Sequence, residues 1–425
     1  MKKKILNVVL IVMLAALCLG VLGSCSSKAA NFFDYSEKDL GLIGRLVSLM
    51  HNKWIHNYGW TVVVFTVFLK IVMLPLDFWQ RFSSRKSSLK MQRIQPLVEA
   101  IDKRYGANTQ RSNEEKQKLY KKSGYSMASM CLPMILSMVI FFVMFGGLRN
   151  YSTYSSIRSF QRLSEEYYDT FVEEIINDPR VSDAYTAELD AKLKAAQDAD
   201  NVLLAKITVE ADIIGAAKDI DEDACDELEA KALKAVQDLY NGEIRESWLW
   251  IQNVWQPDTW ATIMQPFEGG SFGGGGFSAS INTKDYPGGA EISYNRIRNA
   301  VLETGGYGKN GSWNGLMILP FLSIGLSFLS TFIAQLQEKK NRKGEVAQQN
   351  QQQAATGRMT MIMMPLMMAF FGFIYTGAFA IYMVVNYSLS IISTLALRVP
   401  VEKFVLKRLD KEDSKNKSSK ASYMR

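Results

Sequence analysis

The sequence predicts an all-α membrane protein with five membrane-spanning helices, a cytoplasmic helical hairpin and a mostly helical extracytoplasmic insertion. Long apolar blocks alternate with strongly charged ones along the 425 residues, whereas a soluble domain spreads its apolar residues at periods of 2 or 3.6. The chain starts with a secretory signal. Basic residues gather in the short connections between apolar blocks, and the net charge is +7.

The first 24 residues form the predicted signal peptide. Lys2, Lys3 and Lys4 precede the apolar stretch 5–22. The sequence Leu-Gly-Ser-Cys that ends at Cys25 resembles a lipobox, so Cys25 is the predicted lipidation site and 25–58 an anchored extracytoplasmic segment. An ordinary signal peptide, or an uncleaved anchor with a chance cysteine, is the alternative.

Residues 38–56 predict an amphipathic helix that lies in the outer membrane surface. Its apolar residues fall on one side at helical spacing: Leu42, Ile43, Leu46, Leu49, Met50 and Trp54. A helix packed on a soluble partner is the alternative.

The apolar blocks predict five spans of about 20 residues each. Met359 to Leu397 is too long for one span and must fold into a hairpin, with Tyr375-Thr376-Gly377 as its turn. Asp77 ends the first span, and no Asp or Glu lies within the spans. The expected bounds are 59–77, 124–148, 313–335, 359–375 and 377–397.

Basic residues place 78–123, 336–358 and the tail 398–425 in the cytoplasm. The 78–123 segment predicts a helical hairpin that is bent or restarted at Pro96, and the run from Ser112 to Glu115 reads as a capping box that opens its second helix. This basic hairpin either attracts anionic lipid or ribosomal RNA, or serves only as the topology signal.

The segment 149–312 is acidic on balance and predicts an extracytoplasmic insertion. Residues 152–242 are polar and rich in helix formers, and 260–312 are glycine-rich and predict loop or short strand. The run GGSFGGGGF at 269–277 lacks the strand and helix context of a phosphate-binding loop.

Lys70 is the main candidate site residue, because it lies inside the apolar run TVVVFTVFLKIVMLPL at 61–76. We expect no acidic residue near it on its helical face. A charge near the bilayer centre costs about 2.5–3.5 kcal/mol, so Lys70 should face other helices or water. Thr66, one turn earlier, favours a polar groove; snorkelling of Lys70 to the inner interface is the alternative.

Methionines at helical spacing indicate a flexible apolar surface that accepts varied partners. These residues are Met127, Met130, Met134 and Met138 in the second span and Met359, Met363 and Met367 in the fourth. Simple packing or lipid contact is the alternative. Together with Lys70 they suggest a site that holds hydrophobic helices on their way into the bilayer.

Catalysis and cofactors are not expected. The chain has two histidines, His51 and His56, and four cysteines without a metal-ligand or disulfide pattern. No Ser/His/Asp constellation or HExxH motif appears. The lack of acidic residues in the spans also disfavours a cation-coupled transporter.

Several stretches resemble the YidC-type membrane protein insertase family. The resemblance covers roughly 41–150, the short outer loop 243–258 and 313–397, which is over half of the chain. The order of the five spans, the hairpin and the signal fits as well. The matching stretches include NYGWTVVVFTVFLKIVMLPL at 57–76, MQRIQPLVEAIDKRYG at 91–106, CLPMILSMVIFFVMFGGLR at 131–149 and MMPLMMAFFGFIYTGAFAIYMVVNYSLSII at 363–392.

The resemblance implies a five-helix core with a hydrophilic groove open to the cytoplasm and to lipid. The family's groove arginine falls at Lys70, which keeps the charge but lacks the guanidinium fork. The large β-sandwich domain that many Gram-negative members carry before the core is absent, and two insertions split the outer loop instead. Groove positions are assigned to Lys70, Thr66, Ser126, Ser129, Ser327, Gln335 and Asn386, and the substrate-sliding face to Met130, Met134, Met138, Met363 and Met367.

The expected function is therefore insertion and folding of newly made membrane proteins in the bacterial inner membrane, alone or with the Sec translocon. The expected partners are nascent membrane proteins, the bilayer and, through the basic hairpin and tail, the ribosome, but not DNA. An anion channel or transporter that uses Lys70 is the main alternative. A surface lipoprotein whose outer insertion is the functional part is another.

Overall fold

The computed structural model describes residues 30–105, 109–123, 128–255, 263–268, 276–303, 314–341 and 377–422. The predicted signal peptide, Cys25, Ser126 and the predicted fourth span lie outside these residues. The chain divides into two compact units. One consists of Met1–Val21, Val67–Val143 and Ser388–Arg425, and the other of Leu22–Thr66 and Met144–Tyr387.

Helix α3, Tyr58–Tyr105, contains both the predicted first span and the first arm of the predicted hairpin. It continues through Pro75 and Pro96, so the helix does not restart at Pro96, and a bend there stays a prediction. Proline removes one backbone hydrogen bond, and the residues on both sides of it sustain the helix. Helix α4, Thr109–Ser123, starts three residues before Ser112.

Ser112 does not open α4, which corrects the predicted capping box. Its hydroxyl donates to Oδ1 of Asp102 on α3 at 3.0 Å, and Lys116 of α4 forms an ion pair with the same carboxylate. Both arms of the hairpin therefore meet at Asp102. Ile94 and Val98 of α3 are buried, whereas Leu97 is exposed.

Helix α12, Gly377–Ser422, runs from the predicted fifth span through Pro400 into the basic tail. Val401, Val405 and Leu409 form a small core against Phe78 and Phe82 of α3. Beside this core the Arg85 guanidinium donates two hydrogen bonds of 2.9 Å to the Glu402 carboxylate. The apolar contacts and this two-pronged ion pair join the first half of the tail to α3.

Two helices among the described residues are long and apolar enough to cross a membrane, over Tyr58–Lys90 and Gly377–Asp410. Only 22% of the most apolar stretch of each is buried, which differs from the mostly buried core helix of a soluble protein. Helix α10, Ile318–Asn341, contains a shorter apolar segment, Ile318–Ile333.

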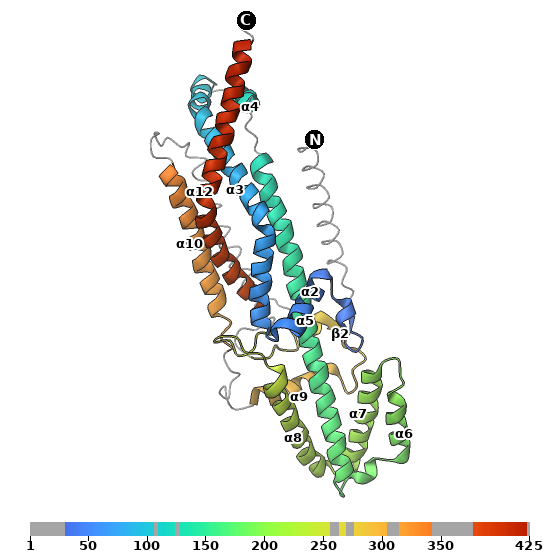
Figure 1. The fold of residues 1–425 in the computed structure, drawn as a ribbon. Helices are drawn as coiled ribbons and strands as arrows, with labels where there is room; N and C mark the ends of the chain where they lie inside the picture. Colours follow the sequence, from blue (N-terminus) through green and yellow to red (C-terminus); the bar gives the residue numbers. More distant parts are fainter. Residues whose placement is uncertain are drawn as a thin grey trace. The chain divides into compact units, whose positions relative to one another are not determined.

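Helix α5, Ala128–Asn177, does not end at residue 148, where the second span was expected to end. It continues into the insertion, where its second half packs with α7 (Val202–Ile220), α8 (Glu222–Leu239) and α9 (Ala290–Glu303). Helix α6, Ala187–Ala196, lies against α7 (Figure 1). The side chains of Thr186, Asn201 and Asp221 cap α6, α7 and α8 at their N-termini.

The second part of the insertion is more ordered than its glycine content suggests. It contains the 14-residue helix α9, which the prediction of loop or short strand missed. The short strand β2, Ile281–Asn282, pairs in parallel with β1, Ala30–Asn31. The residue after β1, Phe32, is fully buried against Phe160, Phe277 and Tyr286. The segment that follows the predicted signal is therefore part of the insertion's core.

The predicted surface helix contains α2, Leu42–Met50, and a π-helical turn η2, His51–Ile55. Its apolar residues do not share one environment, because Val47 and Met50 are buried in the protein whereas Leu42 is 86% exposed. Glu37–Asp39 forms a short 3₁₀ turn, η1, before it. Further short turns are η3 (Ser182–Ala184), η4 (Tyr240–Ile244) and η5 (Ser278–Ser280).

Candidate functional site

Lys70 is paired. Its Nζ lies 2.7 Å from Oδ2 of Asp77, and the two side chains are 17% and 14% exposed. The expectation of no nearby acidic residue on the same face was wrong. Seven residues make almost two helical turns, which returns Asp77 to the face of Lys70. The apolar pattern of the sequence indicates Asp77 only as the end of the span.

The pair lowers the cost of a charge in an apolar helix. An isolated ammonium within the bilayer is expensive, and a carboxylate in contact offsets part of that cost. The contact directs the ammonium toward the end of the expected span. A groove that opens at that end and a snorkelling lysine both place the ammonium there, so the contact is compatible with both interpretations of Lys70.

The hydroxyl proton of Thr66 is already used in a hydrogen bond within its own helix. Its side chain is 2% exposed, and Oγ1 donates to the carbonyl oxygen of Val62 at 2.6 Å. Such a bond to the preceding turn satisfies the hydroxyl within its own helix. The described structure thus places Thr66 in a packed environment.

The other predicted groove residues lie on three helices. Ser327 of α10 is buried and shares a side-chain hydrogen bond with Tyr387 of α12, and Asn386 is half-buried on α12. Helix α5 contains the positions Ser129, Met130, Met134 and Met138, and α10 contains Gln335, but their side chains are outside the described set. Ser126, Met363, Met367 and Cys25 lie outside the described residues altogether.

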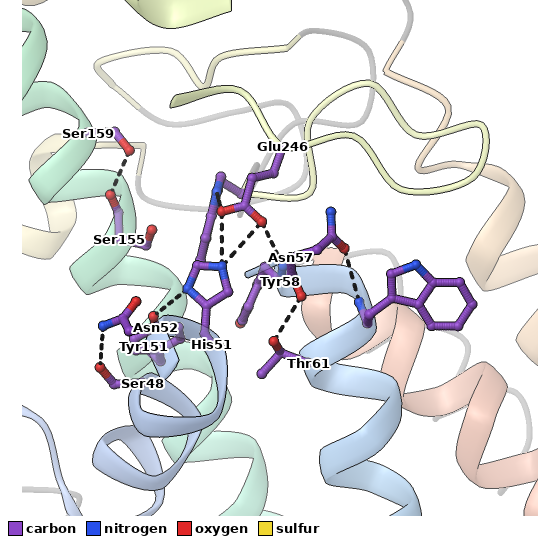
Figure 2. Close-up of polar contacts among 12 residues, drawn as sticks. Ser48, His51, Asn52, Asn57, Tyr58, Thr61, Tyr151, Ser155, Ser159 and Glu246 are labelled. Atoms are coloured by element: carbon purple, nitrogen blue, oxygen red, sulfur yellow. Dashed lines mark hydrogen bonds and ion pairs between the residues drawn. The ribbon is translucent and has the colours of Figure 1, made fainter. Parts of the chain in front are cut away.

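A second polar cluster surrounds the start of α3 (Figure 2). Glu246 is at its centre: Oε2 accepts from the backbone N–H of Tyr58 at 2.6 Å, and Oε1 accepts from the Trp255 indole at 3.1 Å. His51 Nε2 lies 3.1 Å from Oε1, and His51 Nδ1 lies 2.9 Å from the Tyr151 hydroxyl. Sequence analysis missed this cluster, because its members come from three distant segments.

Glu246 closes the N-terminus of the first apolar helix. A helix N-terminus has unpaired backbone N–H groups and a partial positive charge, so a carboxylate there is stabilising. Asn57 contributes a second cap, since Oδ1 accepts from the N–H of Trp60 at 3.2 Å. The Tyr58 ring stacks on Trp255 with centroids 4.1 Å apart. The segment after the helical insertion is thereby fixed to the start of α3.

The described residues contain no group of three or more His, Cys, Asp or Glu side chains that could hold a metal ion. The polar clusters at Lys70 and Glu246 therefore consist of ion pairs and hydrogen bonds.

Comparison with known families identifies the segment around Lys70. A family model described as the 60Kd inner membrane protein matches residues 50–192. Curated proteins called membrane protein insertase YidC match as well. Residues 50–192 of this chain are therefore similar to the YidC family. The match includes Lys70, Asp77 and the start of α5, and it extends into the insertion.

The YidC relatives share only part of their length with this chain. The protein from Caldanaerobacter subterraneus is 39% identical over 114 residues, which are 27% of this chain and 53% of that relative. The Endomicrobium trichonymphae protein is 36% identical over 111 residues, 26% of this chain and 21% of its own. The Treponema denticola protein is 29% identical over 144 residues, which are 31% of this chain and 24% of that relative. No solved structure matches the chain.

Proposed function

We propose that this chain inserts and folds newly made integral membrane proteins through a hydrophilic, positively charged groove within the membrane, without catalysis. The observation that supports this most is a lysine–carboxylate pair on an apolar helix long enough to span a bilayer. Similarity to the YidC family over residues 50–192 supports it too, since the named relatives are membrane protein insertases.

The Lys70–Asp77 pair suggests how a substrate engages. An acidic residue in the part of the substrate that crosses the membrane exchanges with Asp77 as the partner of Lys70. Because one carboxylate replaces another, the ammonium is never left unpaired in an apolar environment. The hydrophobic substrate segment then moves into lipid, driven by the removal of apolar surface from water, and no nucleotide is required.

The proposed setting is a five-span core in the bacterial inner membrane, with the mature N-terminus outside and the C-terminus in the cytoplasm. The groove would contain Lys70, Thr66 and the polar positions of α5, α10 and α12, and the methionine positions would contact the sliding helix. Nascent membrane proteins are the proposed substrates. The Sec translocon and the ribosome are proposed partners, the latter through the basic hairpin and tail.

Reconstitution tests this proposal. The purified full chain in liposomes should protect the translocated part of a newly made small membrane protein from external protease, and empty liposomes should not. Lys70→Arg should retain insertion and Lys70→Glu should impair it, because the second change reverses the charge. Normal insertion by the Lys70→Glu chain would remove the charge from the mechanism. Anion flux without insertion would instead establish the channel alternative.

A further inference from the structure

A tight turn, Trp248–Ile251, exposes two large apolar side chains. The backbone groups of Trp248 and Ile251 exchange two hydrogen bonds of 2.9 Å, which closes the turn. Leu249 at its tip is 62% exposed and has a φ of 54°. Trp250, next to it, is also exposed. The four residues of the turn carry no charge.

Leucine is an unfavourable residue for this backbone. A positive φ suits glycine, whereas a side chain with a Cβ is strained there. Such strain persists only where the surroundings determine the conformation, and it marks functional positions. Glycine would relieve the strain at no cost in packing, because the Leu249 side chain is largely free of protein contacts. We therefore expect the Leu249 side chain to contact a partner outside the described protein.

The turn is held firmly by its neighbours. Trp248 lies so close to Gly59 that no Cβ fits there, and it meets the half-exposed Trp60 edge-to-face with centroids 5.9 Å apart. The Trp250 indole donates to the carbonyl oxygen of Gly315 at 3.2 Å. The polar edge of Trp250 is thus satisfied by protein, and apolar ring surface is left for an external partner.

The position of the turn indicates what that partner is. Gly59 and Trp60 belong to the first turn of α3, and Gly315 lies three residues before the first residue of α10. Both helices begin with apolar side chains that are exposed, among them Met317, Ile318 and Phe321. The turn therefore continues the exposed apolar surface with which these helices start. Tryptophan, with one apolar and one polar edge, is enriched where membrane meets water.

We propose that the Trp248–Ile251 turn inserts Leu249 and Trp250 into the interfacial layer of the bilayer, on the side where α3 begins. Lipid is the occupant of this surface. The rigid contacts to Gly59 and Gly315 fix the depth of the starts of α3 and α10 relative to that layer. This inference does not depend on the insertase proposal, because it needs only that α3 crosses a membrane.

A nitroxide at position 249 tests the proposal in the full chain. Leu249→Cys is introduced after Cys18, Cys25 and Cys131 are replaced by alanine; Cys225 stays because it is buried. The labelled chain is placed in nanodiscs of phosphatidylethanolamine and phosphatidylglycerol. Collision rates with oxygen, which concentrates in lipid, and with a nickel chelate, which stays in water, are then measured.

The matched control is a nitroxide at Ile220, an exposed residue at the end of α7 in the insertion. We expect the oxygen-to-nickel ratio at 249 to exceed that at 220 several-fold. Equal ratios would overturn the proposal. Low collision rates with both reagents at 249 would also overturn it, because they indicate that protein covers the turn.

A Leu249→Cys chain that misfolds would give a misleading ratio. A second label is therefore placed at Trp60→Cys, which leaves the turn sequence intact. It should show the same lipid-like ratio as the label at 249. Both labelled chains are compared with the parent by thermal unfolding. A water-like ratio at 60 in a chain that unfolds like the parent would equally reject the proposal.

Discussion

The ammonium of Lys70 lies 2.7 Å from the carboxylate of Asp77, almost two turns further along the same apolar helix. In this arrangement the cation that the proposed groove offers to a substrate already has an intramolecular partner. A lysine makes a point contact with a carboxylate, whereas an arginine fork binds it through two bonds. Exchange of one carboxylate for another is correspondingly easier at a lysine.

Asp77→Asn should make Lys70 more available to substrates. We expect insertion of a substrate with a single acidic residue in its translocated part to rise about five-fold, as for a pair of ~1 kcal/mol. Protease protection in proteoliposomes measures this. The matched control is Asp102→Asn, which removes a carboxylate paired with Lys116 in the hairpin. An equal rise in both variants would contradict a special role for Asp77.

The field of Asp77 at position 70 can be measured without any substrate. In a Lys70→Cys chain, the carboxylate should favour a cationic methanethiosulfonate over an anionic one. Adding Asp77→Asn should lower the ratio of the two labelling rates several-fold. An unchanged ratio would show that the two side chains do not meet, whatever the result of the insertion assay.

Glu246→Gln should weaken the start of α3. The substitution removes the charge that accepts from Tyr58 N–H and faces His51, so we expect a loss of about 1–3 kcal/mol in the free energy of unfolding. Thermal unfolding in detergent reports the change. Glu243→Gln is the control, because that exposed carboxylate pairs with Arg162 at the surface. Equal unfolding temperatures of the two variants would show that the Glu246 cap does not stabilise the fold.

Glu210 makes the stability of the insertion dependent on pH. Its side chain is 2% exposed on α7, and burial, with a further contribution from Asp169, raises the pKa of Glu210 to about 9. The folded form thus binds a proton that the unfolded form releases near pH 4.5. The contribution of the neutral acid is full below pH 4.5 and is lost as the pH rises through about 9.

Glu210→Gln should therefore stabilise the insertion at alkaline pH and flatten the pH dependence of its unfolding between about 5 and 9. Unfolding is followed by thermal scans at a series of pH values. The exposed Glu173→Gln on α5 is the control and should leave the pH profile unchanged. A Glu210→Gln profile with the parent's slope would disprove the buried-acid assignment.

Phe32→Ala should destabilise the insertion. The ring is fully buried among Phe160, Phe277 and Tyr286, and loss of a buried phenylalanine typically costs about 3–5 kcal/mol. Limited proteolysis within α6–α8 should accelerate accordingly. Leu42→Ala, at a mostly exposed position on α2, should leave the cleavage rate within two-fold of the parent. Similar rates for both variants would mean that the N-terminal segment does not anchor the insertion.

Composition and motifs predicted the apolar helices and the family, because both depend on residues close together in the sequence. Helix lengths were predicted less well: α3 passes through Pro96 and α5 passes residue 148, since tertiary packing sustains a helix beyond its apolar stretch. Helix α9 was hidden because the glycine run before it dominated the composition of its region.

The contacts of the site were harder to predict than its position. Lys70 was found from its unusual place in an apolar run, but its pairing with Asp77 depends on the direction of a long side chain. The cap of Tyr58 by Glu246 joins residues 188 apart, across the whole insertion. Single-sequence patterns contain no information on such distant pairs.

The burial of Phe32 has a consequence for the lipidation expected at Cys25. Ala30, where β1 begins, is the fifth residue after Cys25, and an extended chain covers at most about 3.6 Å per residue step, or ~18 Å in total. A diacylglycerol on that cysteine would tether β1 to the membrane through this short segment. The helical insertion could then turn about this point but could not leave the headgroup region.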